Sequence, residues 1–227
     1  MSTPAPPEAA LGAAAPARCP VCRARATIPF ASVDGTDYGR CHACAAIFMN
    51  ARHHLPREAE HAQYRLHRNH PYDPGYRQFL SKLADPLMAR LKPGSSGLDY
   101  GCGPGPALAA MLSEAGHAMA LYDPLFAPDR TVLNAHYDFV TCSETAEHFH
   151  DPWTEFESLA GLLKPGGWLG VMTGFLTDDI AFARWHYRLD PTHVVFYGEA
   201  TLRHVAARLG LEIDVPVKDV ALMRKRG

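Results

Sequence analysis

Residues 97–105 read Gly97-Leu98-Asp99-Tyr100-Gly101-Cys102-Gly103-Pro104-Gly105. The first four residues have the composition of a buried strand, and the glycines that follow predict a tight turn. Apolar residues recur at helical spacing over 106–115, so the turn joins a strand to a helix and its backbone N–H groups face outward. Glycine in such a turn allows positive φ and a close approach of the backbone to a ligand. The stretch therefore predicts a cofactor-binding loop in an α/β fold.

The spacing of these glycines distinguishes two classes of cofactor site. A dinucleotide fingerprint reads G-x-G-x-x-G, whereas here the third glycine comes one residue early and Pro106 stands in its place. The pattern D-x-G-x-G-x-G, which begins at Asp99, resembles the first motif of the class I S-adenosylmethionine-dependent methyltransferases. The resemblance implies that Asp99, Gly101 and Gly103 contribute to binding S-adenosylmethionine.

The segments downstream extend this resemblance over roughly residues 75–224. A second strand, 117–122, ends at Asp123, where a Rossmann-type fold places an acid that binds two ribose hydroxyls. A D-F-V strand at 137–142, an amphipathic helix at 151–163, an L-K-P-G-G turn and a strand at 168–173 follow in the order typical of the family. The resemblance implies a Rossmann-like methyltransferase sheet with helices on both faces, and it places Ser143 and Glu144 near the methyl donor.

The connection between Asp123 and Tyr137 is short. Only thirteen residues intervene, where the family usually has a helix, a third strand and an acidic loop that contacts adenine. We expect Leu125 or Phe126 to supply an apolar replacement for that contact.

Two C-x-x-C pairs lie near the N-terminus, Cys19 with Cys22 and Cys41 with Cys44. The eighteen residues between the pairs suit a four-cysteine zinc site, and two strand-like segments around Asp34-Gly35 suit the hairpin of a zinc ribbon. The alternative is a redox pair, but a redox C-x-x-C precedes a helix in a βαβ unit. We therefore expect a structural Zn²⁺, because four cysteines leave no coordination position open for catalysis.

Composition sets the expected organisation of the chain. Its 227 residues, 47% of them hydrophobic, suffice for one α/β domain and a small accessory module. We predict a disordered tail at 1–17, a zinc-ribbon-like module at 18–50, a linker at 51–74 and a methyltransferase domain at 75–227. No apolar run reaches the length of a membrane span and the tail lacks a basic start, so we expect a cytoplasmic protein with reduced cysteines.

Charge gives a weaker indication about partners. Residues 1–70 hold eight arginines and five acidic residues, a net charge of +3 within a chain of net charge −2. Nucleic-acid binding usually requires a clustered basic face, so a nucleic-acid partner is possible but not favoured. The sequence carries no signal of oligomeric state.

Histidines are the candidate general bases, because their ordinary pKa of about 6.5 suits proton removal near neutral pH. His193 follows a variable insertion and belongs to a D-x-T-H-x-x-F-Y run similar to one in some small-molecule methyltransferases of this class. His148 belongs to an E-H-F segment, for which packing is the alternative role. Second-line candidates are Tyr64, His67, Tyr187 and Asp190, although the first two also fit a solvated connector.

Three interpretations of the acceptor follow. Four-cysteine modules ahead of this fold resemble those of deoxysugar C-methyltransferases, although that family has a further C-terminal domain. A zinc-bearing N-terminus also resembles ribosomal RNA guanine methyltransferases, which combine three cysteines with a histidine. A non-catalytic zinc-ribbon scaffold is the third, but the intact Asp99, glycines and Asp123 oppose it. The sequence favours methyl transfer to a small molecule.

Overall fold

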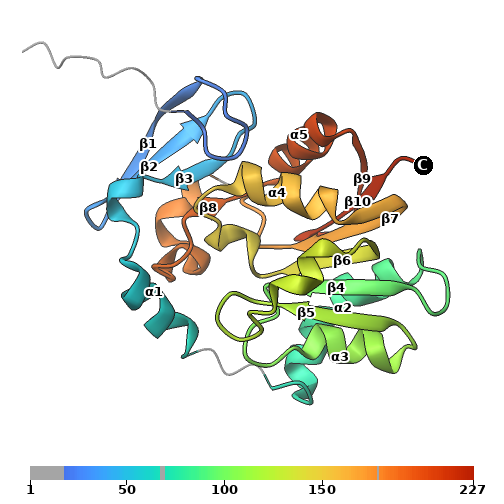
Figure 1. The fold of residues 1–227 in the computed structure, drawn as a ribbon. Helices are drawn as coiled ribbons and strands as arrows, with labels where there is room; N and C mark the ends of the chain where they lie inside the picture. Colours follow the sequence, from blue (N-terminus) through green and yellow to red (C-terminus); the bar gives the residue numbers. More distant parts are fainter. Residues whose placement is uncertain (1–17, 67–69, 178) are drawn as a thin grey trace, which may run out of the picture.

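The computed structural model describes residues 18–66, 70–177 and 179–227 (Figure 1). The expected tail at 1–17 and the candidate His67 lie outside the described residues. Two sheets organise the rest of the chain, one with six strands and one with four.

The larger sheet has the strand order β5-β4-β6-β7-β10-β9. The strands β4 (Ser96–Tyr100), β5 (Ala118–Tyr122), β6 (Tyr137–Ser143) and β7 (Leu163–Met172) run parallel, so their carboxyl ends meet at one edge. The expected C-terminal hairpin, β9 (Leu211–Val217) and β10 (Val220–Lys225), pairs antiparallel with β7 through β10. The glycine turn therefore opens at the edge where parallel α/β sheets bind ligands.

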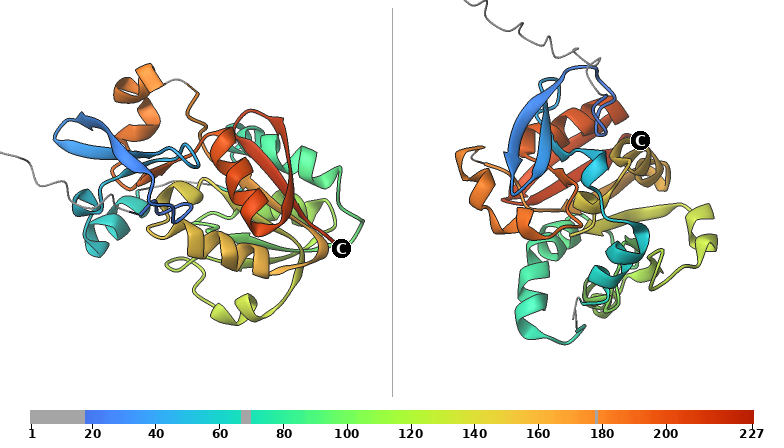
Figure 2. Two further views of the ribbon diagram at one scale, coloured as in Figure 1. Left: turned by 90° about the horizontal axis from the view of Figure 1, so that it is seen from above. Right: turned by 90° about the vertical axis from the view of Figure 1, so that its left-hand side faces the viewer.

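Helices cover both faces of this sheet, as expected (Figure 2). On one face α2 (Pro74–Met88) and α3 (Ala107–Glu114) pack against Phe139, Met172 and Leu222. On the other face α4 (Pro152–Gly161) and α5 (Glu199–Leu209) pack against strand residues of opposite alternation, among them Leu98, Val140 and Val171. None of the helices in the described part of the chain is long and apolar enough to cross a membrane.

The short connection after Asp123 contains a 3-10 turn, η2 (Arg130–Asn134), which contacts β5. Within the described residues β5 is the edge strand, with no strand beyond it. This agrees with the thirteen-residue spacing, which leaves no room for a further strand and helix.

The small sheet has the order β1-β2-β3-β8 and is antiparallel throughout. Its hairpin joins β1 (Thr27–Val33) to β2 (Thr36–Cys41) through Asp34 and Gly35, which both have positive φ, as a type I′ turn requires. After β3 (Ile47–Met49), the fourth strand is β8 (Val195–Phe196), which lies in the insertion between β7 and α5. The sequence does not predict this pairing of distant segments.

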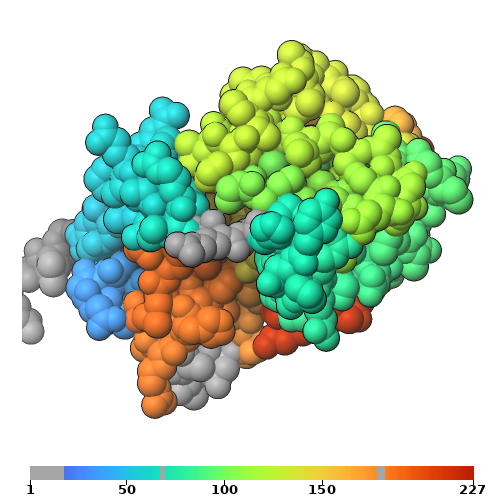
Figure 3. All heavy atoms as spheres, turned by 90° about the horizontal axis from the view of Figure 1, so that it is seen from below, coloured from blue at the N-terminus to red at the C-terminus, as the bar shows by residue number. Residues whose placement is uncertain are grey.

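The segment expected to be a linker contains ordered structure. A 3-10 turn, η1 (Ala51–His53), precedes α1 (Arg57–Tyr64). Seen from below, the cyan and teal surface of this segment adjoins the orange surface of the insertion after β7 (Figure 3).

Gly97 offers a test of packing in the central strand. A Cβ added there would lie 2.2 Å from the ring of Phe139, which is fully buried. We predict that Gly97→Ala destabilises the protein by about 1–3 kcal/mol through overpacking, which lowers the melting temperature by about 2–12 °C. The control is Gly161→Ala at the end of α4, where an added Cβ meets no atom within 4 Å. Equal melting temperatures for the two variants would contradict the packing described for β4.

Candidate active site and cysteine cluster

A cavity of about 1270 Å³ lies at the carboxyl ends of β4, β5 and β6. It is lined by all eight residues predicted for cofactor binding and catalysis, which are Asp99, Gly101, Gly103, Asp123, Ser143, Glu144, His148 and His193. The cavity thus brings these residues together from four separate segments of the chain. Leu125 and Phe126, the expected adenine contacts, also line it.

Glycine is required in the turn after β4. Gly101 has φ +74°, and a Cβ there would lie 2.2 Å from the side chain of Thr145. Gly103 has φ +63°, a conformation that side-chain-bearing residues rarely adopt. The chain thus passes close to Thr145 and turns back toward the cavity.

Asp99 lies under this turn and is almost fully buried. Its Oδ1 accepts a hydrogen bond of 2.7 Å from the Thr141 hydroxyl. Burial raises the pKa of Asp99 to about 6, against the lowering effect of hydrogen bonds from Thr141 and the Ala109 backbone. Asp99 thereby links the turn to α3.

Asp123 organises two turns at once. Its Oδ2 accepts the N–H of Gly103 at 3.1 Å, and its Oδ1 accepts the N–H groups of Leu125 at 2.8 Å and Phe126 at 3.0 Å. A carboxylate offers about four lone-pair positions, so these three bonds leave capacity for a ligand hydroxyl. Asp123 therefore holds two turns of the cavity wall in place and also lines the cavity itself.

Ser143 and Glu144 end β6 at the cavity. The Ser143 hydroxyl is buried and has no hydrogen-bond partner among the described residues, so it can bond a ligand. Glu144 has φ +47°, a strained conformation for a residue with a side chain. Burial, and then the neighbouring Glu147, raise the pKa of Glu144 to about 9, so this carboxyl group is neutral at pH 7.

His148 and His193 lie side by side, with ring centroids 4.7 Å apart. The Nδ1 atom of His148 lies 3.1 Å from the carbonyl oxygen of Thr192, and that of His193 lies 2.7 Å from the carbonyl oxygen of Tyr187. Because a carbonyl only accepts, each Nδ1 carries a hydrogen, and each neutral ring keeps its lone pair on Nε2. Both rings are thus oriented with Nε2 as a proton acceptor.

Glu147 lies between these two imidazoles and is fully buried. Its Oε1 is 4.0 Å from Nε2 of each histidine, while its Oε2 accepts the Thr173 hydroxyl at 2.8 Å. Burial raises the pKa of Glu147, opposed first by the His193 imidazole, and burial lowers the pKa of His193, opposed first by Glu147. Glu147 is not among the residues predicted from the sequence, although an acid directly before His148 was a signal for it.

The segment before α2 forms the outer wall of the cavity. The Tyr64 hydroxyl donates to Glu60 at 2.9 Å, and the Tyr64 ring meets His148 edge-on at 5.2 Å between centroids. Glu60 also lies 3.2 Å from Nε2 of His150. Of the second-line candidates, Tyr64 therefore lines the cavity.

The other two second-line candidates lie behind the cavity wall. Asp190 Oδ2 is 3.8 Å from Nε2 of His193, and the Tyr187 hydroxyl lies 3.4 Å from Glu144. Both residues thus support the histidine pair from the insertion after β7.

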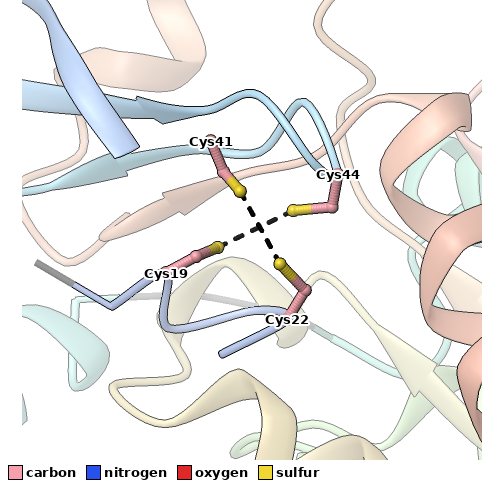
Figure 4. A group of neighbouring side chains, drawn as sticks. All are labelled: Cys19, Cys22, Cys41 and Cys44. Atoms are coloured by element: carbon pink, nitrogen blue, oxygen red, sulfur yellow. Dashed lines mark hydrogen bonds between the residues drawn. The ribbon is translucent and has the colours of Figure 1, made fainter. Parts of the chain in front are cut away.

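The four N-terminal cysteines form one buried cluster (Figure 4). The sulfurs of Cys19 and Cys44 are 3.7 Å apart, those of Cys22 and Cys41 are 3.6 Å apart, and all four lie within 4.8 Å of one another. Sulfurs placed tetrahedrally at about 2.3 Å around Zn²⁺ are about 3.8 Å apart. The spacing is therefore compatible with a zinc-binding module.

The cysteine module is attached firmly to the larger sheet and its helices. Arg23 pairs with Asp151, the N-cap of α4, at 2.5 Å, and Arg208 of α5 donates to the carbonyl oxygen of Cys22. From β3, the N–H of Met49 donates to Val194 at 2.8 Å, next to His193. The module and the insertion after β7 thus share one hydrophobic core.

Residues 64–214 match a family described as a methyltransferase domain. The match spans more than half of the chain and contains the glycine turn, most of the cavity lining and the histidine pair. The chain belongs to this family of methyltransferase domains.

The chain is also similar to other proteins over part or most of its length. Over 38 residues the chain is 50% identical to the ubiquinone biosynthesis O-methyltransferase of Nitrosospira multiformis, a segment that spans 17% of this chain and only 16% of that enzyme. The fold is similar to that of the 1,6-didemethyltoxoflavin-N1-methyltransferase of Burkholderia thailandensis, solved with 1,6-didemethyltoxoflavin and S-adenosylhomocysteine. The TM-score between the two structures is 0.51 and the sequence identity is 16%, over 88% of this chain and 99% of the Burkholderia chain. An O-methyltransferase family protein of the same organism gives a TM-score of 0.46 at 17% identity, over 69% of this chain and 61% of the other. The methyltransferase fold expected from the sequence is confirmed.

The three bonds of Asp123 lead to a prediction for the ligand-free protein. Asp123→Ala leaves the N–H groups of Gly103, Leu125 and Phe126 without their acceptor, so we expect a loss of about 1–3 kcal/mol in stability. Hydrogen exchange at these three amides should accelerate, while exchange at the Thr131 amide, which Asp129 caps, should not change. Unchanged exchange at all four amides would show that Asp123 does not hold the two turns.

Proposed function

We propose that this protein transfers a methyl group from S-adenosylmethionine to a small-molecule acceptor. The observation that carries the proposal is the single cavity that joins the glycine turn and Asp123 to the pair His148 and His193. A cofactor end and an acceptor end thus open into one space, which is what an in-line methyl transfer needs.

The cofactor end fits S-adenosylmethionine by its donors and acceptors. Gly103 leaves open space along the turn, Asp123 has lone pairs for ribose hydroxyls, and the Ser143 hydroxyl has no other partner among the described residues. S-adenosylmethionine, when bound, supplies an electrophilic methyl group on a sulfonium. Asp99 and Glu144 shape this end of the cavity, Asp99 from beneath the turn and Glu144 from the end of β6.

The acceptor end holds the groups that remove a proton. Each imidazole presents Nε2 as an acceptor because its Nδ1–H is fixed on a carbonyl. His193 or His148 acts as the general base, and Glu147 stabilises the positive charge that the ring then carries.

The cysteine module has a structural role in this proposal. Cys19, Cys22, Cys41 and Cys44 hold one Zn²⁺ in a closed shell, so the ion supplies no catalytic position. Through β3 and Val194 the module fixes the backbone next to His193. We therefore infer that zinc stabilises the acceptor side of the cavity, in a cytoplasmic enzyme whose cysteines stay reduced.

Labelled-methyl transfer from S-adenosylmethionine into separated metabolite, RNA and protein fractions tests the proposed acceptor class. We expect label in the metabolite fraction. Label confined to RNA would support a ribosomal-RNA-type methyltransferase instead, and label in no fraction would favour a non-catalytic scaffold.

Ligand-dependent melting tests the cofactor. A ligand at about 100 times its Kd adds about 2.7 kcal/mol to the stability of the folded state, which corresponds to about 5–11 °C for a chain of this size. We predict this shift with S-adenosylhomocysteine and none with NAD, because the glycine spacing is not the dinucleotide spacing. Asp123→Ala should remove most of the shift, since the ribose hydroxyls lose a charged acceptor. A shift with NAD alone would refute the proposal.

Metal analysis tests the cysteine cluster. We predict about one zinc per chain. Cys22→Ser should lose the zinc and lower the melting temperature by about 5–15 °C, because the free energy of zinc binding contributes to the free energy of folding. The control is Cys142→Ser, which changes a buried thiol outside the cluster and should keep the metal. A Cys22→Ser protein with full zinc content and an unchanged melting curve would rule out the site.

A further inference from the structure

The acceptor end of the cavity has an unsatisfied requirement. Glu147 is fully buried, and its Oε1 has no hydrogen-bond partner among the described residues. Leaving a buried carboxyl oxygen unpaired is costly. The Nε2 atoms of His148 and His193 lie 4.0 Å from this oxygen, which is too far for a hydrogen bond. A ligand with donor hydrogens would satisfy this atom.

Three acceptor atoms converge at this place, namely Glu147 Oε1, His193 Nε2 and His148 Nε2. Glu147 Oε1 is 4.0 Å from each of the two imidazole nitrogens, and the two nitrogens are at most 4.8 Å apart. The circle through the three atoms therefore has a radius of about 2.2–2.5 Å. A nitrogen at an ordinary hydrogen-bond distance of about 2.8 Å from each atom would lie about 1.3–1.7 Å above their plane. The circle thus has the size for a hydrogen-bond donor without any movement of the three side chains.

The same geometry disfavours a metal ion. Zinc requires nitrogen and oxygen ligands at about 2.0–2.2 Å. An ion equally far from the three atoms comes closest to them in the plane of the circle, at its radius of about 2.2–2.5 Å, and this distance equals or exceeds the zinc distance. The cysteine cluster, in contrast, has sulfur separations of 3.6 and 3.7 Å that match a bound ion. The two clusters therefore suit different ligands.

Charge selects among the possible donors. The carboxyl side chains that line the cavity are Glu60, Asp99, Asp123, Glu144, Glu147 and Glu155, whereas Arg57 is the only arginine or lysine in the described lining. A buried carboxylate is stabilised most by a cation that also donates hydrogen bonds. A hydroxyl has one hydrogen to donate, but a primary ammonium has three and carries the charge.

We propose that the methyl acceptor is a primary amine, which enters as its ammonium and is bound by Glu147 and His193, with His148 on the third side. This inference rests on the proposed methyltransferase function and names its substrate class. Glu147 is the residue that selects the amine. Other titratable groups that face the three side chains are Tyr64, Glu144, Tyr187 and Asp190.

The chemistry balances with these residues. An ammonium R–NH₃⁺ has no lone pair, so one N–H proton first passes to Nε2 of a histidine and leaves R–NH₂. The nitrogen lone pair then attacks the sulfonium methyl carbon, the S–CH₃ bond breaks with its electron pair kept by sulfur, and R–NH₂–CH₃⁺ forms. Glu147 balances the imidazolium during this step.

Recognition of the ammonium group can be measured without knowing the rest of the substrate. The probes are methylammonium, tetramethylammonium, which has the charge but no N–H donor, and methanol, which has a donor but no charge. Added to the full-length protein saturated with S-adenosylhomocysteine, methylammonium should shift the ring signals of His193 and His148 with a Kd at least tenfold below those of the other two probes. Equal responses to all three probes, or none to methylammonium, would overturn the proposal.

Glu147→Gln provides the matched variant, because its amide oxygen can still accept from Thr173. We expect it to weaken methylammonium binding at least tenfold and to keep the S-adenosylhomocysteine melting shift, whereas Glu157→Gln, at an exposed position of α4, should change neither. Equimolar Mn²⁺ tests whether the same three side chains bind a metal ion. If it broadens both ring signals and blocks the response to methylammonium, the site binds a metal and not an amine.

Product analysis separates this inference from the proposed function. Labelled product retained on a cation exchanger and carrying an N–CH₃ group would support the amine. Labelled methyl ethers or esters would overturn the amine and leave the methyltransferase intact. Absence of both label and S-adenosylhomocysteine binding would overturn the proposed function itself.

Discussion

The parallel pairing of β4 with β5 and β6 is the constraint on which the cavity depends. Parallel strands end at a common edge, so Asp99 and the glycine turn, Asp123, and the pair Ser143 and Glu144 meet there although they are far apart in the sequence. Close contacts maintain this edge. Gly97 lies against the ring of Phe139, and Gly101 lies against Thr145, so a side chain at either glycine would clash with its neighbour.

Local sequence patterns explain why the part of the cavity formed by the ends of β4, β5 and β6 could be predicted from the sequence. Each cofactor-side residue follows directly on a strand that is recognisable by its composition, and strand order follows from the alternation of strands and helices. The thirteen-residue connection after Asp123 could likewise be interpreted by length alone, and the structure has a single 3-10 turn there. The cysteine pairs were equally local, because each C-x-x-C fixes two sulfurs through its own backbone.

The acceptor side could be predicted only in part, because it depends on contacts between distant segments. His148 and His193 were recognisable as titratable residues, but their pairing arises from the insertion after β7 folding back over β6. The strand β8 has two residues, too few for any periodic pattern, and its partner β3 lies near the other end of the chain. The wall formed by α1 was equally hidden, since the polar sequence of residues 51–66 is also that of a solvated connector.

Glu147 shows how burial changes the meaning of a residue. In the sequence it is one acid in a short polar segment, comparable with Glu144 three residues earlier. In the structure burial raises the pKa of both carboxyl groups, but for Glu147 this effect is opposed first by the imidazole of His193. Glu147 faces two imidazoles whose tautomers are fixed by the carbonyl oxygens of Thr192 and Tyr187. The N–H of Val194 donates to the Glu147 carbonyl and the Met49 N–H donates to Val194, so a continuous backbone connection runs from the cysteine module to this carboxylate. The module therefore helps to position Glu147 and His193 at the cavity.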